Sequence, residues 1–354
     1  MCVIPQAEEP RWIILGDPRR AIPVLRSWRP FKLQSQLKWK LVVLASSANA
    51  LTHLRGTVCE TVRLDLTYWQ RRLPGCSQDW TYVIHVGNAS HTRKAILFML
   101  GKDAAVKAVA KVPLAEEASG AILNEATILR RLHPLGDLPE VLFQDEQHGI
   151  AAQTWLEGKA VSRTFEVAHI DLLSRLAQED ESVRLCDFQS SIAANLDKLD
   201  LPLDRSRLGQ ALDLMDSEEK LPAFIEHRDF TPWNLKRLRS GHFGLLDWEW
   251  AVEKGLPWQD ICRFFYEQDF LFQGPGKVWE TLSSHPLLRT YLRRFDIPAD
   301  TLPGLTMHYL LRNLCLRVLH MDTTSFDTAA VEYTVQQIEA ILDTKARISS
   351  KSRI

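Results

Sequence analysis

Three oxygen-bearing side chains, Asp229, Asn234 and Asp247, follow one another at a spacing that suits phosphate chemistry. Asp229 comes after an apolar run, and Asn234 follows five residues later, so one short turn can present both to a single ligand. Residues 238–246 have the pattern of a hairpin with a Ser-Gly turn, and Asp247 stands at its end. The pattern predicts that an acid, a carboxamide and a second acid meet at one site.

Such a set can divide the work of phosphoryl transfer to a hydroxyl group. Asp229 can accept or orient the proton of the attacking hydroxyl, while Asn234 and Asp247 offer oxygens to Mg²⁺. The metal ion bridges phosphate oxygens and offsets the charge that develops on them. The alternative is a surface turn that carries these acids by chance.

The same segment resembles the catalytic and metal-binding region of the aminoglycoside phosphotransferase and choline kinase family, small-molecule relatives of protein kinases. His227, Asp229 and Asn234 match the family's HxDxxxxN loop, and residues 246–249, LDWE, match its second acidic motif. The resemblance implies that Asp229 is catalytic, that Asn234 and Asp247 bind metal and that His227 supports the loop. It also implies an α+β, bilobal protein-kinase-like fold.

Composition agrees with a soluble enzyme of this kind. A chain of 354 residues with 45% hydrophobic content can form two domains. The net charge of −1 argues against nucleic acid as a partner, and no apolar run reaches the roughly 18 residues of a membrane span. Six scattered cysteines lack metal-ligand spacing and indicate reduced thiols. Glu8 and Glu9 argue against a secretory signal, so we expect a cytoplasmic protein.

Residues 1–77 lie outside the resemblance and are predicted to form an N-terminal α/β extension of unknown role, with a strand at Trp12–Leu15. Residues 33–52 have the three-to-four spacing of an amphipathic helix, and its apolar stripe comprises Leu37, Leu41, Leu44, Ala48 and Leu51. Basic residues flank this stretch. Two interpretations remain open: the helix docks on the kinase-like body, or it contacts an anionic membrane or a partner.

Residues 78–158 are predicted to form a five-stranded antiparallel N-lobe, with strands at 82–86, 93–99, 105–112, 141–143 and 150–154. In the family, the first hairpin covers the nucleotide phosphates and normally contains several glycines. This chain keeps only Gly87, so side chains such as Ser90 would have to supply donors. The departure leaves open how tightly the loop closes.

The third predicted strand carries Lys107 and Lys111 on one face. The resemblance implies that one lysine neutralises the nucleotide phosphates, and the context Val-Ala-Lys-Val favours Lys111. A helix is predicted over 114–132, where the family has a glutamate that pairs with the lysine. Glu125 has the best register for this role.

Residues 153–158 resemble the family's hinge, whose backbone binds the adenine edge, and Trp155 and Leu156 lie at its centre. Backbone recognition does not distinguish ATP from GTP. Residues 159–348 are predicted to form a mainly helical C-lobe. Its acid-rich segment 179–181 is expected to be a solvated turn, and Asp260 is implied to anchor a helix near the catalytic loop.

These observations predict Mg²⁺-dependent transfer of the γ-phosphate of ATP or GTP to a hydroxyl of a small molecule such as an aminoglycoside, sugar or amino alcohol. One alternative is a catalytically weak, kinase-like scaffold or sensor that binds nucleotide and acts through a partner protein. Another is transfer of AMP on the same fold. Neither the acceptor nor the oligomeric state follows from the sequence.

Overall fold

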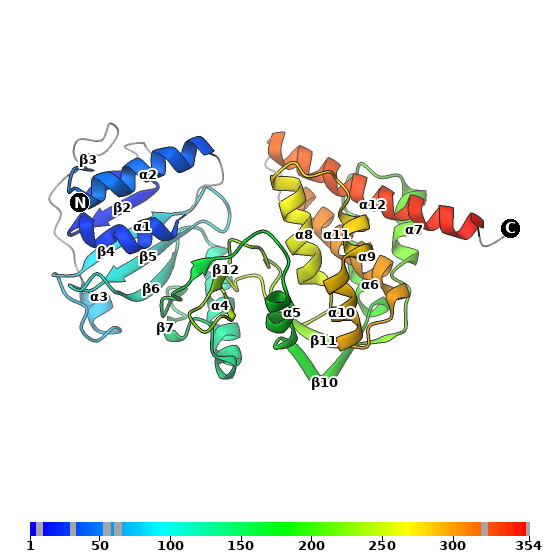
Figure 1. Ribbon diagram of the computed structural model, residues 1–354, viewed down its shortest axis with the longest axis horizontal. Coiled ribbons are helices and arrows are strands. Elements are labelled where there is room, and N and C mark those ends of the chain that lie inside the picture. Colours follow the sequence, from blue (N-terminus) through cyan, green and yellow to red (C-terminus); the bar gives the residue numbers. More distant parts are fainter. Residues whose placement is uncertain (5–9, 29–32, 52–57, 60–65, 320–324, 352–354) are drawn as a thin grey trace. The chain divides into compact units, whose positions relative to one another are not determined.

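The computed structural model describes the whole chain except residues 5–9, 29–32, 52–57, 60–65, 320–324 and 352–354 (Figure 1). The chain forms two compact units. The N-terminal unit comprises Met1–Ala160 and Leu246–Trp250, and the C-terminal unit comprises Val161–Leu245 and Ala251–Ile354. Thr52, the end of the helix expected over residues 33–52, lies outside the described residues.

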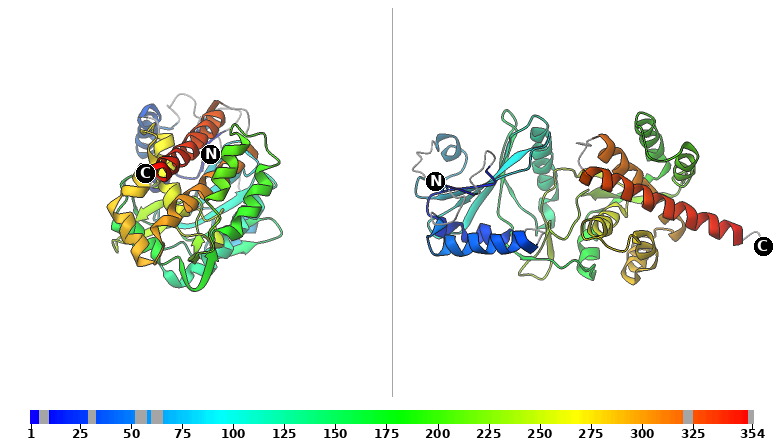
Figure 2. Two further views of the ribbon diagram at one scale, coloured as in Figure 1. Left: turned by 90° about the vertical axis from the view of Figure 1, so that its right-hand side faces the viewer. Right: turned by 90° about the horizontal axis from the view of Figure 1, so that it is seen from above.

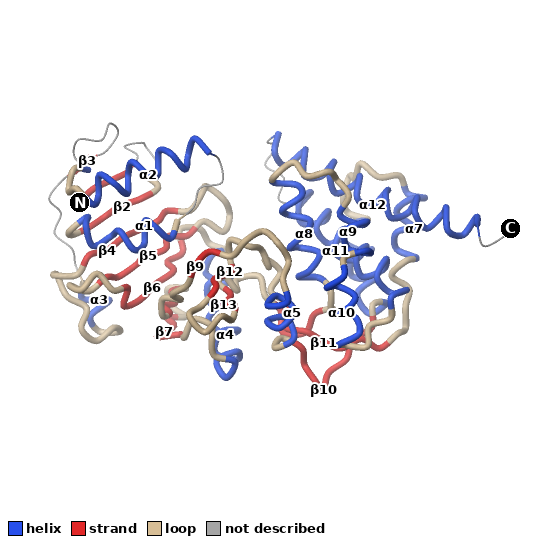
Figure 3. Tube along the Cα trace, in the orientation of Figure 1, coloured by secondary structure: helices blue, strands red, loops and turns tan. Residues whose placement is uncertain are grey.

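An eight-stranded sheet forms the centre of the N-terminal unit, in the order β3-β1-β2-β4-β5-β6-β8-β7 (Figure 3). Each neighbouring pair is antiparallel. All five strands predicted within residues 78–158 are present, and residues 2–59, expected to belong to a separate extension, add three more. The strands are β1 (Cys2–Ile4), β2 (Trp12–Leu15), β3 (Val58–Cys59), β4 (Thr81–Val86), β5 (Lys94–Leu100), β6 (Val106–Pro113), β7 (Val141–Asp145) and β8 (Ile150–Gln153). A short strand, β9 (Lys159–Ala160), ends this part of the unit.

Helices cover both faces of this sheet. On one face α1 (Ile22–Ser27) and α2 (Leu33–Ser47) pack on a core that includes Trp12 and Ile14 of β2. On the other face, residues around α3 (Thr67–Gln70) pack on a core with Tyr82 and Met99. Helix α4 (Ala118–Leu132), which corresponds to the predicted helix over 114–132, packs against β6, β7 and β8.

Helix α2 buries a different face from the one expected. Leu37, Leu41 and Leu44 of the predicted stripe are 56%, 58% and 66% exposed. The residues that pack on the core are Trp39, Val42, Val43 and Ala45. Both faces have apolar residues at intervals of three and four, so periodicity alone does not identify the buried one. The tertiary contacts decide, since the Trp39 indole donates to the main-chain oxygen of Leu25 at 2.7 Å.

The C-terminal unit is mainly helical, as predicted. Its helices are α5 (Val167–Ser174), α6 (Cys186–Leu196), α7 (Arg205–Asp213), α8 (Gln259–Leu271), α9 (Val278–Ser284), α10 (Pro286–Arg294), α11 (Leu302–Leu319) and α12 (Ser325–Lys351). Helices α9 and α10 are separate, because Pro286 suits the first position of a new helix. Among the described helices, none has both the length and the apolar composition of a membrane-spanning segment.

Two small groups of strands belong to the C-terminal unit. Strands β10 (Ala177–Arg184), β11 (Lys220–Glu226) and β14 (Val252–Gly255) form an antiparallel sheet, where the sequence predicted helices or loops. The acid-rich segment 179–181 is therefore not a turn between helices. It lies within β10 at a break in register with β11, where a bulge frees it from the ladder. The predicted hairpin is confirmed by β12 (Leu235–Arg237) and β13 (Phe243–Leu245).

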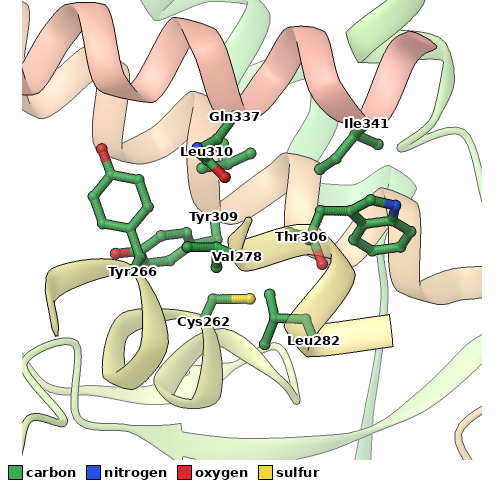
Figure 4. Close-up of a pocket in the computed structure, with 10 residues that line it drawn as sticks. Cys262, Tyr266, Val278, Leu282, Thr306, Tyr309, Leu310, Gln337 and Ile341 are labelled. Atoms are coloured by element: carbon green, nitrogen blue, oxygen red, sulfur yellow. The ribbon is translucent and has the colours of Figure 1, made fainter. Parts of the chain in front are cut away.

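A small cavity lies between α8, α9, α11 and α12 (Figure 4). Its volume is about 10 Å³, and Cys262, Tyr266, Thr306 and Tyr309 are among its lining residues. A space of this size holds about one water molecule. The cavity is therefore part of the helix packing and is too small for a substrate.

Candidate active site

The structure brings Asp229 and Asn234 together in the loop between β11 and β12. The Asn234 side-chain amide donates to Oδ2 of Asp229 at 2.7 Å and to the main-chain oxygen of Asp229 at 3.0 Å. Asn234 is 9% exposed, and this pairing fixes its amide. The five-residue spacing in the sequence thus forms one compact turn.

Two residues that were expected to support this loop do so. Nδ1 of the buried His227 accepts the main-chain N–H of Asp229 at 3.1 Å. The Asp260 carboxylate accepts the main-chain N–H groups of His227 and Arg228, both at 2.8 Å. Burial and the neighbouring Glu226 carboxylate raise the pKa of Asp260 to about 7. Arg228 has a φ of 66°, a strained backbone conformation of the kind that gathers at functional sites.

Arg263 of α8 is a site residue that the sequence analysis missed. Its Nε and Nη2 atoms donate to Oδ1 of Asp229 at 3.2 and 2.9 Å. Its Nη1 donates to Glu267 at 2.6 Å, and Arg317 pairs with the same glutamate at 2.8 Å. Burial lowers the pKa of Arg263, but the Glu267 and Asp229 carboxylates outweigh it and raise the pKa above its ordinary value. The four-residue spacing of Arg263 and Glu267 was visible in the sequence, whereas the contact with Asp229 was not.

In the N-terminal unit, the predicted pair of Lys111 and Glu125 is formed. Lys111 Nζ lies 2.5 Å from Glu125 Oε2, 2.6 Å from Asp247 Oδ1 and 2.8 Å from Glu249 Oε1. Glu249, the last residue of the LDWE motif, was not predicted as a site residue. Lys94 at the start of β5 was also missed, and it pairs with the same Glu249.

The charged groups of this cluster shift one another's pKa values. Burial lowers the pKa of Lys111, but Asp247, Glu125 and Glu249 together raise it well above its usual range. Burial raises the pKa of Asp247, and the cations of Lys111 and Lys94 overcome this effect and hold it below its ordinary value. Burial raises the pKa of Glu125. Asp247 also has a φ of 69°, so its backbone is strained beside its charged partners.

Strand register explains why Lys111, and not Lys107, enters the cluster. Lys111 is at the centre of the sheet, paired with Ile96 on β5 and Ala151 on β8. Lys107 lies near the start of β6, where its side chain is 42% exposed and pairs with Asp103 at 2.7 Å. The two lysines share a face, but only one is buried against α4.

The loop between β4 and β5 has the predicted glycine at its base. The Gly87 N–H donates to the Lys94 main-chain oxygen at 2.9 Å, and a Cβ at this position would lie only 3.0 Å from that oxygen. Glycine is therefore needed for the close approach of the two strands. Ser90 is exposed in the loop. Arg11, from the N-terminal segment, donates to the Asn88 side chain and holds the loop from outside the predicted lobe.

The predicted hinge follows β8 directly. Trp155 and Leu156 are half-buried, and the Trp155 ring packs edge-on against Phe98, with 5.7 Å between ring centroids. The Thr154 N–H donates to the Glu140 main-chain oxygen at 2.8 Å, which fixes the chain just before these residues. The segment is therefore positioned by the sheet, as a hinge requires.

Of the three carboxylates that surround the Lys111 ammonium at 2.5–2.8 Å, Asp247 is the one that a divalent ion can reach. Oxygens of Glu125, Asp247 and Glu249 lie within 4.8 Å of one another. The Asp247 side chain is 39% exposed, whereas Glu125 and Glu249 are each 3% exposed and face Lys111. Carboxylate oxygens are the ligands that Mg²⁺ prefers, and Asp247 is the accessible one. Asn234, the other predicted ligand, belongs to the C-terminal unit.

Comparison with known proteins agrees with this geometry. The model of the phosphotransferase enzyme family matches residues 95–273. No curated protein matches the chain.

Several solved structures share the fold. A provisionally assigned aminoglycoside phosphotransferase of Ralstonia eutropha has a TM-score of 0.53 and 13% identity, over 79% of this chain and 98% of its own. The macrolide 2′-phosphotransferase of Brachybacterium faecium has a TM-score of 0.52 and 12% identity, over 76% and 96%. The macrolide 2′-phosphotransferase type I has a TM-score of 0.50 and 13% identity, over 77% of this chain and 98% of its own. Identities this low show the fold alone, and they confirm the kinase-like architecture.

The family match covers half of the chain and runs from β5 to the end of α8, so it includes both Lys111 and the segment from Asp229 to Asp247. The chain therefore belongs to the phosphotransferase enzyme family.

Proposed function

We propose that the protein is a Mg²⁺-dependent small-molecule kinase that transfers the γ-phosphate of ATP or GTP to a hydroxyl group. The proposal rests on one observation in this member of the phosphotransferase enzyme family, which is the way the Asp229 side chain is held. Its carboxylate is held by the Asn234 amide on one oxygen and by Arg263 on the other. A carboxylate fixed in this way can orient an acceptor hydroxyl and take its proton as the new oxygen–phosphorus bond forms.

The remaining residues have roles in binding the nucleotide. Lys111 donates to its phosphates, and Glu125 holds Lys111 in place. Asn234 and Asp247 provide oxygens for the metal, and Mg²⁺, when bound, neutralises phosphate charge. Gly87 and Ser90 belong to the loop that covers the phosphates. The backbone at Trp155 and Leu156 binds the base.

The proposed acceptor is a small molecule with a hydroxyl group, such as an aminoglycoside, a sugar or an amino alcohol. Two of the solved structures with this fold are macrolide 2′-phosphotransferases, and a third is assigned to aminoglycosides. These neighbours support hydroxylated compounds as the first class to test. They do not choose one compound, because substrate contacts come from variable parts of the fold.

The test is release of ADP from ATP, or of GDP from GTP, in the presence of each of a panel of hydroxylated compounds, with and without Mg²⁺. Release that needs both an acceptor and Mg²⁺, and that is lost in Asp229→Asn, supports the proposal. Mass spectrometry of the product distinguishes transfer of phosphate from transfer of AMP. Metal-independent release, or release unchanged in the variant, would contradict it.

One observation favours the second candidate, a catalytically weak nucleotide-binding scaffold. Both carboxylate oxygens of Asp229 already accept hydrogen bonds, so an acceptor hydroxyl has to compete with Asn234 and Arg263 for them. A thermal-shift titration with ATP and Mg²⁺ separates the two candidates. Metal-dependent stabilisation without product from any acceptor would indicate the scaffold.

A further inference from the structure

One segment near the N-terminus has basic residues without acidic ones. Residues 18–59 contain no aspartate or glutamate and have a net charge of +8, whereas the whole chain carries −1, so the rest carries −9. The eight cationic residues are Arg19, Arg20, Arg26, Arg29, Lys32, Lys38, Lys40 and Arg55. A segment of this charge is suited to an anionic surface.

Helix α2 lies in this segment, and its orientation on the sheet is fixed. Trp39, Val42 and Val43 pack on the core, and the Trp39 indole donates to the Leu25 main chain. The Ser46 hydroxyl donates to the main-chain oxygen of Pro18 at 2.5 Å. These contacts determine which side of α2 faces outward. In the right-hand view of Figure 2, α2 (blue) runs along one side of the N-terminal unit.

The outward side of α2 carries a row of leucines. Leu37, Leu41 and Leu44 are 56%, 58% and 66% exposed, and their spacing of four and three residues places them next to one another. Single exposed leucines are common on protein surfaces, but a contiguous apolar row marks a site of interaction. We call these three residues the leucine row.

Lysines flank the leucine row on both sides. At 100° per residue, Lys38 lies on one side of the row and Lys40 on the other, and both are exposed. Long lysine side chains can keep the ammonium group at a polar surface while the leucines enter an apolar layer. An exposed apolar row between two cations is suited to contact with the headgroup region of a membrane.

A groove between α1 and α2 continues the same surface. Its volume is about 570 Å³, and Arg26 and Lys40 are among its lining residues. Trp28 also lines it and is 39% exposed. A tryptophan beside two cations is typical of the level of lipid headgroups, where an amphipathic ring and phosphate contacts are both favoured.

We propose that α2 binds the surface of an anionic bilayer, with the leucine row in the headgroup–acyl boundary and Lys38, Lys40 and Arg26 on lipid phosphates. Charge distinguishes this occupant from a second copy of the chain. A symmetric contact through α2 would bring Arg26, Lys38 and Lys40 of two copies together, whereas an anionic membrane complements these cations. Nucleic acid would satisfy the charges and leave the leucines exposed. Membrane binding here goes beyond phosphate transfer and does not require it.

The experiment is flotation of the full chain with vesicles of phosphatidylcholine alone and with vesicles that contain about 30% phosphatidylglycerol. The expected result is binding to the anionic vesicles that weakens as salt rises. The double variant Lys38→Gln with Lys40→Gln should lower the partition coefficient roughly 30-fold. Each cation near the surface contributes about 1 kcal/mol, and about 1.4 kcal/mol corresponds to a tenfold change.

Leucine substitutions test the apolar part with a matched control. Leu37→Gln with Leu41→Gln should lower partition at least about tenfold, since two apolar side chains leave the interface. Leu316→Gln with Leu319→Gln changes two leucines of α11 that are 49% and 58% exposed, and it should bind like the wild type. Because all four side chains are exposed, the variants should keep the wild-type melting temperature.

Three results would overturn the proposal. The first is no binding of the wild type to anionic vesicles. The second is that the α2 variant and the α11 control lose vesicle binding to the same extent, or that neither of them loses it. The third is a wild-type dimer, seen by light scattering, that Leu37→Gln with Leu41→Gln converts to a monomer while vesicle binding persists. That last result would make the leucine row an interface between copies.

Discussion

Arg263 holds Asp229 through two of its nitrogens, Nε and Nη2, which both donate to Oδ1 at 3.2 and 2.9 Å. The other carboxylate oxygen receives the Asn234 amide at 2.7 Å. Asp229 is therefore fixed by two side chains that approach it from different segments of the C-terminal unit. Helix α8, which follows the LDWE motif in the sequence, thus takes part in positioning the residue proposed to be catalytic.

Replacement of Arg263 should impair turnover more than nucleotide binding. Arg263→Met frees the carboxylate to rotate, and a misplaced catalytic group costs on the order of 100-fold in kcat. The KM for nucleotide should change little, and Arg263→Lys should recover part of the loss. Steady-state kinetics check both parameters. Arg207→Met removes a different ion pair, between α7 and α12, and should leave kcat unchanged.

Replacement of Asp229 by asparagine should nearly abolish transfer. The amide cannot take a proton, and general-base assistance is typically worth about 10²–10⁴-fold in rate. Nucleotide affinity should persist, because the residues assigned to the nucleotide phosphates belong to the N-terminal unit. Turnover and a nucleotide titration measure the two effects. Asp171→Asn, at an exposed ion pair with Arg294, serves as the control, and unchanged turnover in Asp229→Asn would remove the assignment.

Replacement of Lys111 should destabilise the N-terminal unit. Lys111→Met leaves Glu125, Asp247 and Glu249 without their shared cation, and breaking a buried ion pair costs about 3–5 kcal/mol. Lys107→Met on the same strand removes only an exposed pair, which is worth about 0–1 kcal/mol. Urea denaturation of both variants tests the difference. Equal free energies of unfolding would contradict a buried charge cluster.

Stability should fall in mild acid because of His85. Burial, with smaller contributions from Arg11 and Lys94, lowers the pKa of His85 to about 4 from an ordinary 6.5. Between these values the unfolded chain binds a proton that the folded chain does not, so stability is lost as pH falls from about 6.5 to 4. At pH 5 the loss is about 2 kcal/mol relative to neutral pH.

The packing around His85 offers a direct check. Its ring lies 4.6 Å from Trp12 and 4.5 Å from Trp28, between centroids, so an aromatic replacement fits the same space. His85→Phe should remove this part of the acid sensitivity in thermal unfolding at pH 5 and 7. The control His133→Phe changes a side chain that is 63% exposed, and this variant should retain the acid sensitivity of the wild type. A pH dependence that survives in His85→Phe would point to another group.

The sequence by itself determined the parts of this protein that depend on local spacing. The five residues from Asp229 to Asn234 form one turn, and the hairpin before Asp247 follows from its Ser-Gly turn and apolar strands. Period-two alternation placed Lys107 and Lys111 on one face, and a three-to-four pattern predicted α2. In each case the structure-forming interaction is between neighbours along the chain.

Tertiary structure decided everything that depends on which surfaces meet. The resemblance already favoured Lys111 over Lys107, and the tertiary structure supplies the physical reason, because Lys111 is paired with strands on both sides and lies against Glu125. Tertiary structure brought Arg263 to Asp229 across more than thirty positions of sequence.

It also turned the leucine row of α2 outward, because the opposite face carries Trp39 and packs on the sheet. Two apolar faces with the same period look alike in a sequence, and a contact between distant residues leaves no periodic signal. The energy that separates these alternatives comes from burial and charge pairing, which exist only once the chain has folded.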